Sequence, residues 1–231
     1  MASFASDTPD QDHLRLIAAA ARGDDRLLLE VYHGKPDWTT HADRAALRQA
    51  LQKAAAKGAL RMVPQLFAWG AEVNTYWPGE VSPLFRAVEG RYIAMVRVFL
   101  KEGALPDWRR PRDQRTALFL AFLHGEYVVV RDLLDAGADA RARDHEGRTP
   151  LLYAATEKAS MWYTATLQLL LDKGADMDAH DGGAVSVVAN VQATNPRGIT
   201  ALYLAAKKDR VAMVRYLFKR GADVRVVGDS G

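Results

Sequence analysis

The sequence predicts an all-α solenoid of about six helix-turn-helix units, with β-hairpin loops along one edge. Two repeated markers carry this prediction. The dipeptide Gly-Ala recurs with successive spacings of 33, 34, 37 and 47 residues, beginning at Gly70, Gly103, Gly137, Gly174 and Gly221. A second marker, Ser or Thr followed by Pro or Ala and then Leu, begins 21 or 25 residues before the last four glycines, at Ser82, Thr116, Thr149 and Thr200. A fixed period of this length is typical of stacked units that share one core.

Each period has the pattern of two helices. The Ser or Thr of the second marker can cap the free N–H groups of a first helix, and Pro at the next position fits the first turn. Small apolar residues such as Leu151, Ala154 and Ala155 then share one face. A break follows, at Gly125 in one unit and at Gly58 in an earlier one, and a second helix rich in large apolar residues comes next. The Gly of the Gly-Ala marker is expected to end that second helix in a left-handed conformation.

The early units carry weaker forms of the pattern. Gln49-Ala50-Leu51 stands 21 residues before Gly70 and replaces the Ser/Thr marker there. Residues 14–35 show an alanine-rich helix, a break at Gly23 and a leucine-rich second helix, without a Thr-Pro start. Terminal repeats are expected to be atypical because their outer face meets water.

These markers resemble the ankyrin repeat family. Residues 144–176, DHEGRTPLLYAATEKASMWYTATLQLLLDKGAD, are similar to its pattern D-x-x-G-x-T-P-L-H-x-A-A … L-L-x-x-G-A-D. The family usually has His after Thr-Pro-Leu, and we expect an apolar contact to replace its polar link here. The residues at that place are Gln52, Phe85, Phe119, Leu152 and Tyr203.

The resemblance implies one ankyrin-repeat domain over residues 12–226, between a flexible tail at 1–11 and a C-terminal tail at 227–231. Its units are expected at about 12–43, 44–76, 77–110, 111–143, 144–180 and 195–226. Two insertions break the period, one within 157–166 and a longer one at about 181–194. The longer one alternates in part like an extended β-hairpin, and the alternative is a tolerated surface insertion.

Composition narrows the function classes. The absence of cysteine excludes a disulfide framework, a thiolate zinc site and a cysteine nucleophile. No apolar run approaches the roughly 20 residues of a membrane-spanning helix. Lys and Arg number 31 against 28 Asp and Glu, a net charge of +3, which does not by itself indicate nucleic acid. We expect a monomer, located in the cytoplasm or the nucleus, that uses no cofactor.

In proteins of this family, the loops between units and the inner face of the first helices contact the partner. The resemblance therefore implies a set of partner-binding residues: Tyr76, Trp77, Arg86, Trp108, Arg109, Arg110, Arg112, Arg115, His124, His145, Glu146, Arg148, Tyr153, Glu157, Trp162, Arg197, Lys207 and Lys208.

The segment DWRRPRDQR, residues 107–115, is the most distinctive of these loops. Arg and Trp are enriched at interface hot spots because each combines a large contact area with a directional polar group. The expected anchors are Trp77, Trp108, Arg109, Arg112 and Trp162. The alternative is a solvated loop whose arginines pair with Asp107 and Asp113.

Other chemistries find weaker support in the sequence. Asp176, Asp178, His180 and Asp181 resemble the start of a calcium loop, but Asp181 and Val187 stand where such a loop needs Gly and Glu. We expect no metal site. His145 and Glu146 beside Arg148 could act as an acid–base group, although adjacent loop residues in a repeat hairpin are more often simply exposed. Trp108 with Lys207 and Lys208 could hold a nucleic acid, but acidic residues nearly balance the basic ones.

We therefore expect a non-enzymatic recognition scaffold that holds another protein in its concave groove, and an acidic partner surface would suit the Arg-rich loop. The alternative is an enzyme or a small-molecule-binding protein on the same scaffold, with its site near 157–166 and 181–194. An enzyme would need a closed pocket with convergent titratable groups.

Overall fold

The computed structural model describes residues 11–34, 38, 40–74, 79–156, 162–176 and 199–224. Within these ranges the regular elements are helices, and no strand is found. This confirms the predicted all-α class of helix-turn-helix units. The chain divides into two compact units, unit 1 (Met1–Leu105) and unit 2 (Pro106–Gly231).

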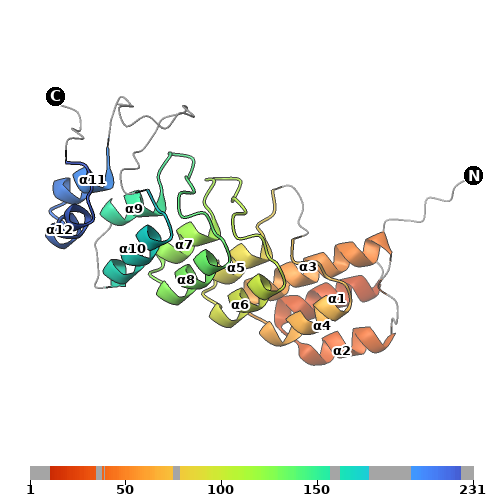
Figure 1. Ribbon diagram of the computed structural model, residues 1–231. Coiled ribbons are helices and arrows are strands. Elements are labelled where there is room, and N and C mark those ends of the chain that lie inside the picture. The colour runs from red at the N-terminus through yellow and green to blue at the C-terminus, as the bar shows by residue number, and fades with distance from the viewer. Residues whose placement is uncertain are drawn as a thin grey trace, which may run out of the picture. The chain divides into compact units, whose positions relative to one another are not determined.

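Unit 1 holds the first six α-helices (Figure 1). They are α1 (Gln11–Arg22), α2 (Asp25–Gly34), α3 (His41–Lys57), α4 (Val63–Ala68), α5 (Pro83–Glu89) and α6 (Ile93–Lys101), with the 3-10 turn η1 (Leu60–Met62) before α4. Helix α1 packs against α2 and α3, α3 packs against α4 and α5, and α5 packs against α6. First helices therefore stack on one another, and each is backed by its own second helix.

Unit 2 repeats this scheme, and its first helices have seven residues each, as α5 does, and are shorter than α1 and α3. Its helices are α7 (Ala117–Leu123), α8 (Tyr127–Asp135), α9 (Pro150–Thr156), α10 (Trp162–Asp172), α11 (Ala201–Lys207) and α12 (Val211–Lys219). Helix α9 lies between α7 and α11, and α10 packs on α8. Buried alanines on the first helices, Ala121, Ala154 and Ala205, are 0% exposed and allow this close approach.

The predicted caps are present at the first helices that carry the Ser/Thr marker. Ser82 Oγ accepts a hydrogen bond from the backbone N–H of Phe85 at 3.2 Å. Thr116, Thr149 and Thr200 cap their helices in the same way, at 3.2–3.4 Å. The closing glycines are left-handed as predicted, with φ between 78° and 95°.

The weaker marker at Gln49 does not begin a helix. It lies inside the 17-residue helix α3, which starts eight residues earlier at His41. Thr40 and Asp43 form a capping box there, because the Thr40 side chain accepts from Asp43 N at 3.1 Å and Asp43 Oδ2 accepts from Thr40 N at 2.9 Å. Asp43 also accepts a hydrogen bond from His13 Nε2 at 2.6 Å, and both side chains are buried.

Candidate functional site

Two loops of unit 2 are joined into one surface, the loop platform, formed by residues 107–115 and 139–148. His145 N donates to Asp113 O at 3.0 Å, and Arg109 Nη1 donates to Arg143 O at 2.7 Å. Asp139 N donates to Asp107 Oδ1 at 2.9 Å. Each loop also closes on itself through a backbone hydrogen bond, from Arg110 N to Arg115 O and from Asp144 N to Arg148 O. The loops thus turn like hairpins without forming strands among the described residues.

Arg110 and Asp113 form a buried ion pair inside the platform. Arg110 is 7% exposed and Asp113 is 9% exposed. Arg110 Nε donates to Asp113 Oδ1 at 2.9 Å, and Nη2 donates to Oδ2. The hydrogen bond from Arg110 lowers the pKa of Asp113, although burial alone would raise it. Arg110 therefore holds its own loop together through Asp113.

Asp144 organises the second loop from a fully buried position. Its Oδ1 accepts hydrogen bonds from the backbone N–H groups of Glu146 and Arg148, both at 3.0 Å. Its Oδ2 accepts from Arg148 Nη2 at 3.0 Å and lies 3.7 Å from Arg115 Nε. One carboxylate thus fixes a turn and two guanidinium groups.

Tyr153 on α9 contacts both of those guanidinium groups. Its ring centre is 5.1 Å from Arg115 Cζ and 4.7 Å from Arg148 Cζ, within the range of cation–π contacts. Arg115 Nη2 also donates to the Tyr153 hydroxyl at 3.0 Å. Phe119, which stands where the family has His, is fully buried and meets the Tyr153 ring edge-on at 5.2 Å. This apolar contact is the kind expected at that position.

A few side chains form the solvent-exposed side of the loop platform. The Arg112 side chain is 75% exposed, and Arg109 is exposed while its guanidinium is held by Arg143 O. His145 and Glu146 are about half exposed, with His145 Nε2 3.8 Å from Glu146 Oε1. Glu146 Oε2 is instead 2.7 Å from Arg148 Nη1. Trp108 is half-buried beside Arg109.

The other predicted residues belong to other elements or fall outside the described residues. Arg86 belongs to unit 1, where it pairs with Glu89 at 2.9 Å. His124 ends α7, Lys207 ends α11 and lies 5.7 Å from the Tyr203 ring, and Lys208 follows it. Trp162 begins α10, but its side chain is outside the described part. Four residues lie outside it altogether: Tyr76, Trp77, Glu157 and Arg197.

The structure bears on metal binding and on enclosed pockets within the described ranges. No group of three His, Cys, Asp or Glu residues that could hold a metal ion occurs there. Asp176 is described, whereas Asp178, His180 and Asp181 are not. A shallow cavity of about 330 Å³ lies in unit 1, lined by Asp25, Leu28, Leu29, Arg61 and Gln65. It contains none of the predicted site residues. No described helix is long and apolar enough to cross a membrane.

Sequence reasoning missed the organising role of Asp144 and named Asp113 only as a pairing alternative. The sequence contains a pattern that could have indicated these roles. Each Asp precedes an Arg within the same short turn, Asp113 before Arg115 and Asp144 before Arg148. It also missed Arg143, which accepts from Arg109 through its carbonyl and donates to Gly147 O at 2.7 Å.

Stacked helix pairs joined by hydrogen-bonded loops define an all-α repeat protein. Comparison with known families agrees: residues 51–144 and 84–181 match a profile of three ankyrin repeats, and residues 197–229 match a single ankyrin repeat. The chain belongs to the ankyrin repeat family.

Similar proteins share the repeats over part of their length. Human B-cell lymphoma 3 protein is 32% identical over 187 residues, which cover 71% of this chain and 40% of that protein. Mouse neurogenic locus notch homolog protein 1 is 33% identical over 60% of this chain and 5% of its own length. The Drosophila melanogaster ankyrin repeat and KH domain-containing protein mask is 37% identical over 52% of the chain and 3% of its own length. The chain thus spans less than half of each relative.

Proposed function

We propose that the protein is a non-enzymatic protein-interaction scaffold and that the loop platform of unit 2 contacts the partner. Membership in the ankyrin repeat family supports the general role, since such repeats use stacked loops as extended binding surfaces. The finer proposal, that a partner lies in a concave groove lined by these loops, extends the prediction made from the sequence.

One observation carries the choice of surface. Internal hydrogen bonds fix the platform loops, while Arg112 points outward and Arg109 stays exposed. A pre-organised surface loses less conformational freedom on binding, which favours affinity. The exposed guanidinium groups suit carboxylates because each offers paired N–H donors. We therefore propose a partner that presents an acidic segment.

Arg110 is left out of the proposed contact set, because its charge is already paired with Asp113. Trp108, Arg109 and Arg112 remain the proposed anchors from this loop. Trp77 and Trp162 remain predictions, as do the monomeric state and the cytoplasmic or nuclear location. The enzymatic alternative near 157–166 and 181–194 falls largely outside the described residues, and no observation favours it.

The test is quantitative affinity capture from the native source, with the folded chain immobilised. Wild type is compared with Arg109→Glu/Arg112→Glu, and with Arg44→Glu/Lys53→Glu as a control that reverses two exposed charges on α3. We expect specific partners to be retained by wild type and the control, and reduced about tenfold or more by the platform variant. Equal capture by all three proteins would reject the platform as the binding surface. Thermal unfolding of each variant checks that the fold is intact.

A further inference from the structure

In the inner part of the loop platform, three guanidinium groups share two buried carboxylates. The side chain of Asp113 is 12% exposed and contacts Arg110 and, at 3.8 Å, Arg115. The side chain of Asp144 is 0% exposed and contacts Arg148 at 3.0 Å and Arg115 at 3.7 Å. These five side chains together have a net charge of +1, so one guanidinium charge is left to be balanced by another acid.

Glu146 balances that charge from the solvent side. Its Oε2 is 2.7 Å from Arg148 Nη1, while Arg148 Nε and Nη2 both donate to Asp144 Oδ2, at 3.2 and 3.0 Å. The Glu146 side chain is 50% exposed. Exposed ion pairs contribute little to stability, because water solvates the separated charges well. Asp144 is therefore a fixed part of the loop, whereas the Glu146 carboxylate can leave Arg148 at small cost.

A second guanidinium group stands beside Arg148. Arg115 directly precedes its capping threonine, as Arg148 does, and the Cζ atoms of both arginines lie about 5 Å from the centre of the Tyr153 ring, at 5.1 and 4.7 Å. Among the described residues, the Arg115 side chain makes one hydrogen bond, from Nη2 to the Tyr153 hydroxyl. Since a guanidinium group carries five N–H donors, Arg115 can take a further acceptor that approaches Arg148.

We propose that Glu146 is an internal competitor for the partner and that a carboxylate of the partner's acidic segment displaces it from Arg148. This inference rests on the proposed function, because Arg109 and Arg112 first hold the acidic segment on the same platform. A segment held there presents its next carboxylate to Arg148 at high effective concentration. The exchange replaces one carboxylate by another, so the charge of Arg148 stays paired throughout.

The competition makes the platform selective for the number of acidic residues. A segment with one carboxylate is held by the outer arginines alone, because it cannot also replace Glu146. A segment with a second carboxylate within reach gains Arg148, and it displaces only a weak, exposed pair. Removing the charge of Glu146 should therefore strengthen the binding of such a segment.

The probe is an acidic peptide of about 12 residues, up to about 40 Å long when extended, selected by phage display on the full wild-type chain. Derivatives replace each of its Asp or Glu residues singly by Asn or Gln, and fluorescence anisotropy measures every dissociation constant. We expect Glu146→Gln to tighten binding of the parent peptide about threefold or more. One derivative, which lacks the carboxylate that reaches Arg148, should bind wild type and Glu146→Gln equally.

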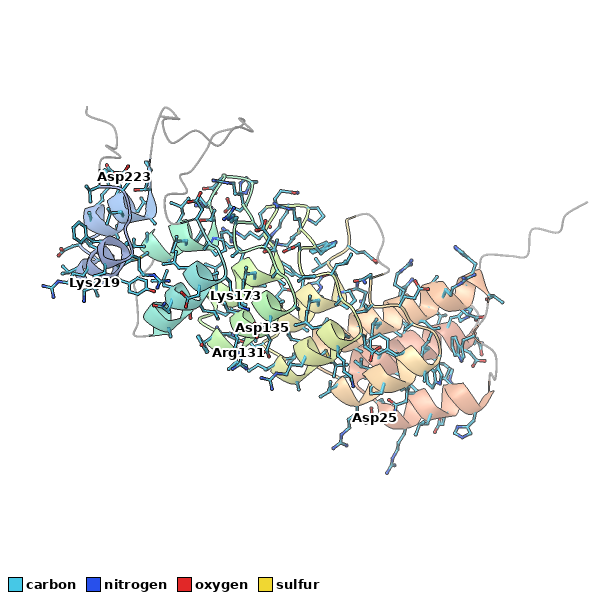
Figure 2. The ribbon with its side chains drawn as sticks, viewed as in Figure 1. Asp25, Arg131, Asp135, Lys173, Lys219 and Asp223 are labelled. Atoms are coloured by element: carbon cyan, nitrogen blue, oxygen red, sulfur yellow. The ribbon has the colours of Figure 1, made fainter. Side chains whose placement is uncertain are left out.

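Asp135→Asn is the matched control for the loss of one exposed negative charge in unit 2. Asp135 Oδ1 is 2.8 Å from Lys173 Nζ, and its side chain is 54% exposed, close to the value for Glu146 (Figure 2). The ion pair Asp172–Arg220 is of the same exposed type. Since Asp135 lies on α8 and not in the platform loops, Asp135→Asn should leave the affinity for the peptide unchanged.

Arg148→Lys tests the named contact while keeping a cation beside Asp144. Lysine has a single side-chain nitrogen, so it cannot serve Asp144 and a second carboxylate with the geometry of a guanidinium group. In an Arg148→Lys background, we expect Glu146→Gln to have no effect on affinity. Thermal unfolding of every variant checks that the fold is intact.

The outcomes separate this inference from the proposed function. Unchanged or weaker binding by Glu146→Gln would overturn the inference. So would a gain matched by Asp135→Asn, or one that persists in Arg148→Lys or with every peptide derivative. If Arg109→Glu/Arg112→Glu weakens binding while Glu146→Gln has no effect, the inference alone fails. If no acidic peptide is selected, or Arg109→Glu/Arg112→Glu leaves its binding unchanged, the proposed function fails as well.

Discussion

The ring of Tyr92 lies in the space that a side chain at Gly58 would need: a β-carbon built on Gly58 would stand 2.6 Å from Tyr92 Cε1. Gly58 ends α3 with φ 75°, and Tyr92 precedes α6 of the next helix pair. Gly90 is close to the other edge of the same ring, because a β-carbon built there would overlap Tyr92 Cε2. Two glycines thus allow one tyrosine to pack between successive repeats of unit 1.

Replacing Gly58 by alanine is therefore expected to destabilise unit 1 by about 2–3 kcal/mol, of which the left-handed backbone accounts for on the order of 1 kcal/mol in a residue with a β-carbon. The remainder is the displacement of Tyr92. Gly70→Ala is the matched control, because Gly70 also has a positive φ, 95°, but a β-carbon added there would have no other atom within 4 Å. Urea unfolding followed by circular dichroism measures both.

A second pair of variants separates the packing of Tyr92 against Gly58 from the backbone conformation of Gly58. In a Tyr92→Ala background, Gly58→Ala should cost no more than Gly70→Ala does, because the obstructing ring is gone. If the Gly58→Ala penalty stayed equally large without Tyr92, the backbone conformation alone would explain it and the packing argument would be wrong.

Removing one partner of the Arg110–Asp113 pair should destabilise unit 2 strongly. Arg110→Ala is expected to lower the free energy of unfolding by about 3 kcal/mol, because it leaves a buried carboxylate without its main counter-charge. Arg112 lies in the same loop but its side chain is 75% exposed, so Arg112→Ala should change the free energy by less than about 0.5 kcal/mol. Chemical denaturation of both variants measures the contrast. Equal effects would show that the loop arginines are interchangeable.

The same pair predicts a pH dependence with a definite sign. The pKa of Asp113 in the folded protein lies below its ordinary value of 3.8, chiefly because Arg110 donates a hydrogen bond to it. Its contribution to stability is therefore fully present above pH 3.8 and declines as the pH falls through the lower folded-state pKa. The stability difference between wild type and Asp113→Asn should shrink as the pH falls below this value. A difference that grew with acid would contradict the assignment.

The start of α3 offers a prediction in unit 1. Thr40→Ala removes one cap and should cost about 1 kcal/mol. Asp43→Ala removes the capping box and also leaves buried His13 without this carboxylate, so we expect a loss of about 3 kcal/mol. Thermal and urea unfolding of the two variants compares them. Similar losses would mean that the His13–Asp43 hydrogen bond contributes little to stability.

The periodic features of the fold could be predicted from the sequence because they are local. Thr116 caps its helix and Gly137 ends the next one for reasons contained within a single repeat. The start of α3 was also accessible, since Thr40 and Asp43 have the Ser/Thr-x-x-acid spacing of a capping box. The repeat marker at Gln49 was misleading there, because it falls inside the helix and does not mark its start.

The roles of the loop arginines could not be predicted in this way. Arg110 and Arg112 are two positions apart in one loop, and only the turn geometry buries the first and exposes the second. Tyr153 was among the predicted contacts, yet its two guanidinium neighbours come from different loops. Such contacts depend on how one repeat stacks on the next, which the period of the sequence does not specify.

The ion pairs Asp135–Lys173 and Asp172–Arg220 affect whether the helix pairs of unit 2 can be placed in a different order. Both pairs are largely exposed, so each adds little to stability, but a mismatch brings like charges together. If the α11–α12 pair were moved ahead of α9–α10, Lys219, which like Asp135 stands two residues before a closing glycine, would meet Lys173. Helix pairs of unit 2 are therefore not fully equivalent modules: recombination or grafting at these junctions keeps the attraction only when both members of a charge pair are carried over, and each pair gives a small preference for the existing order.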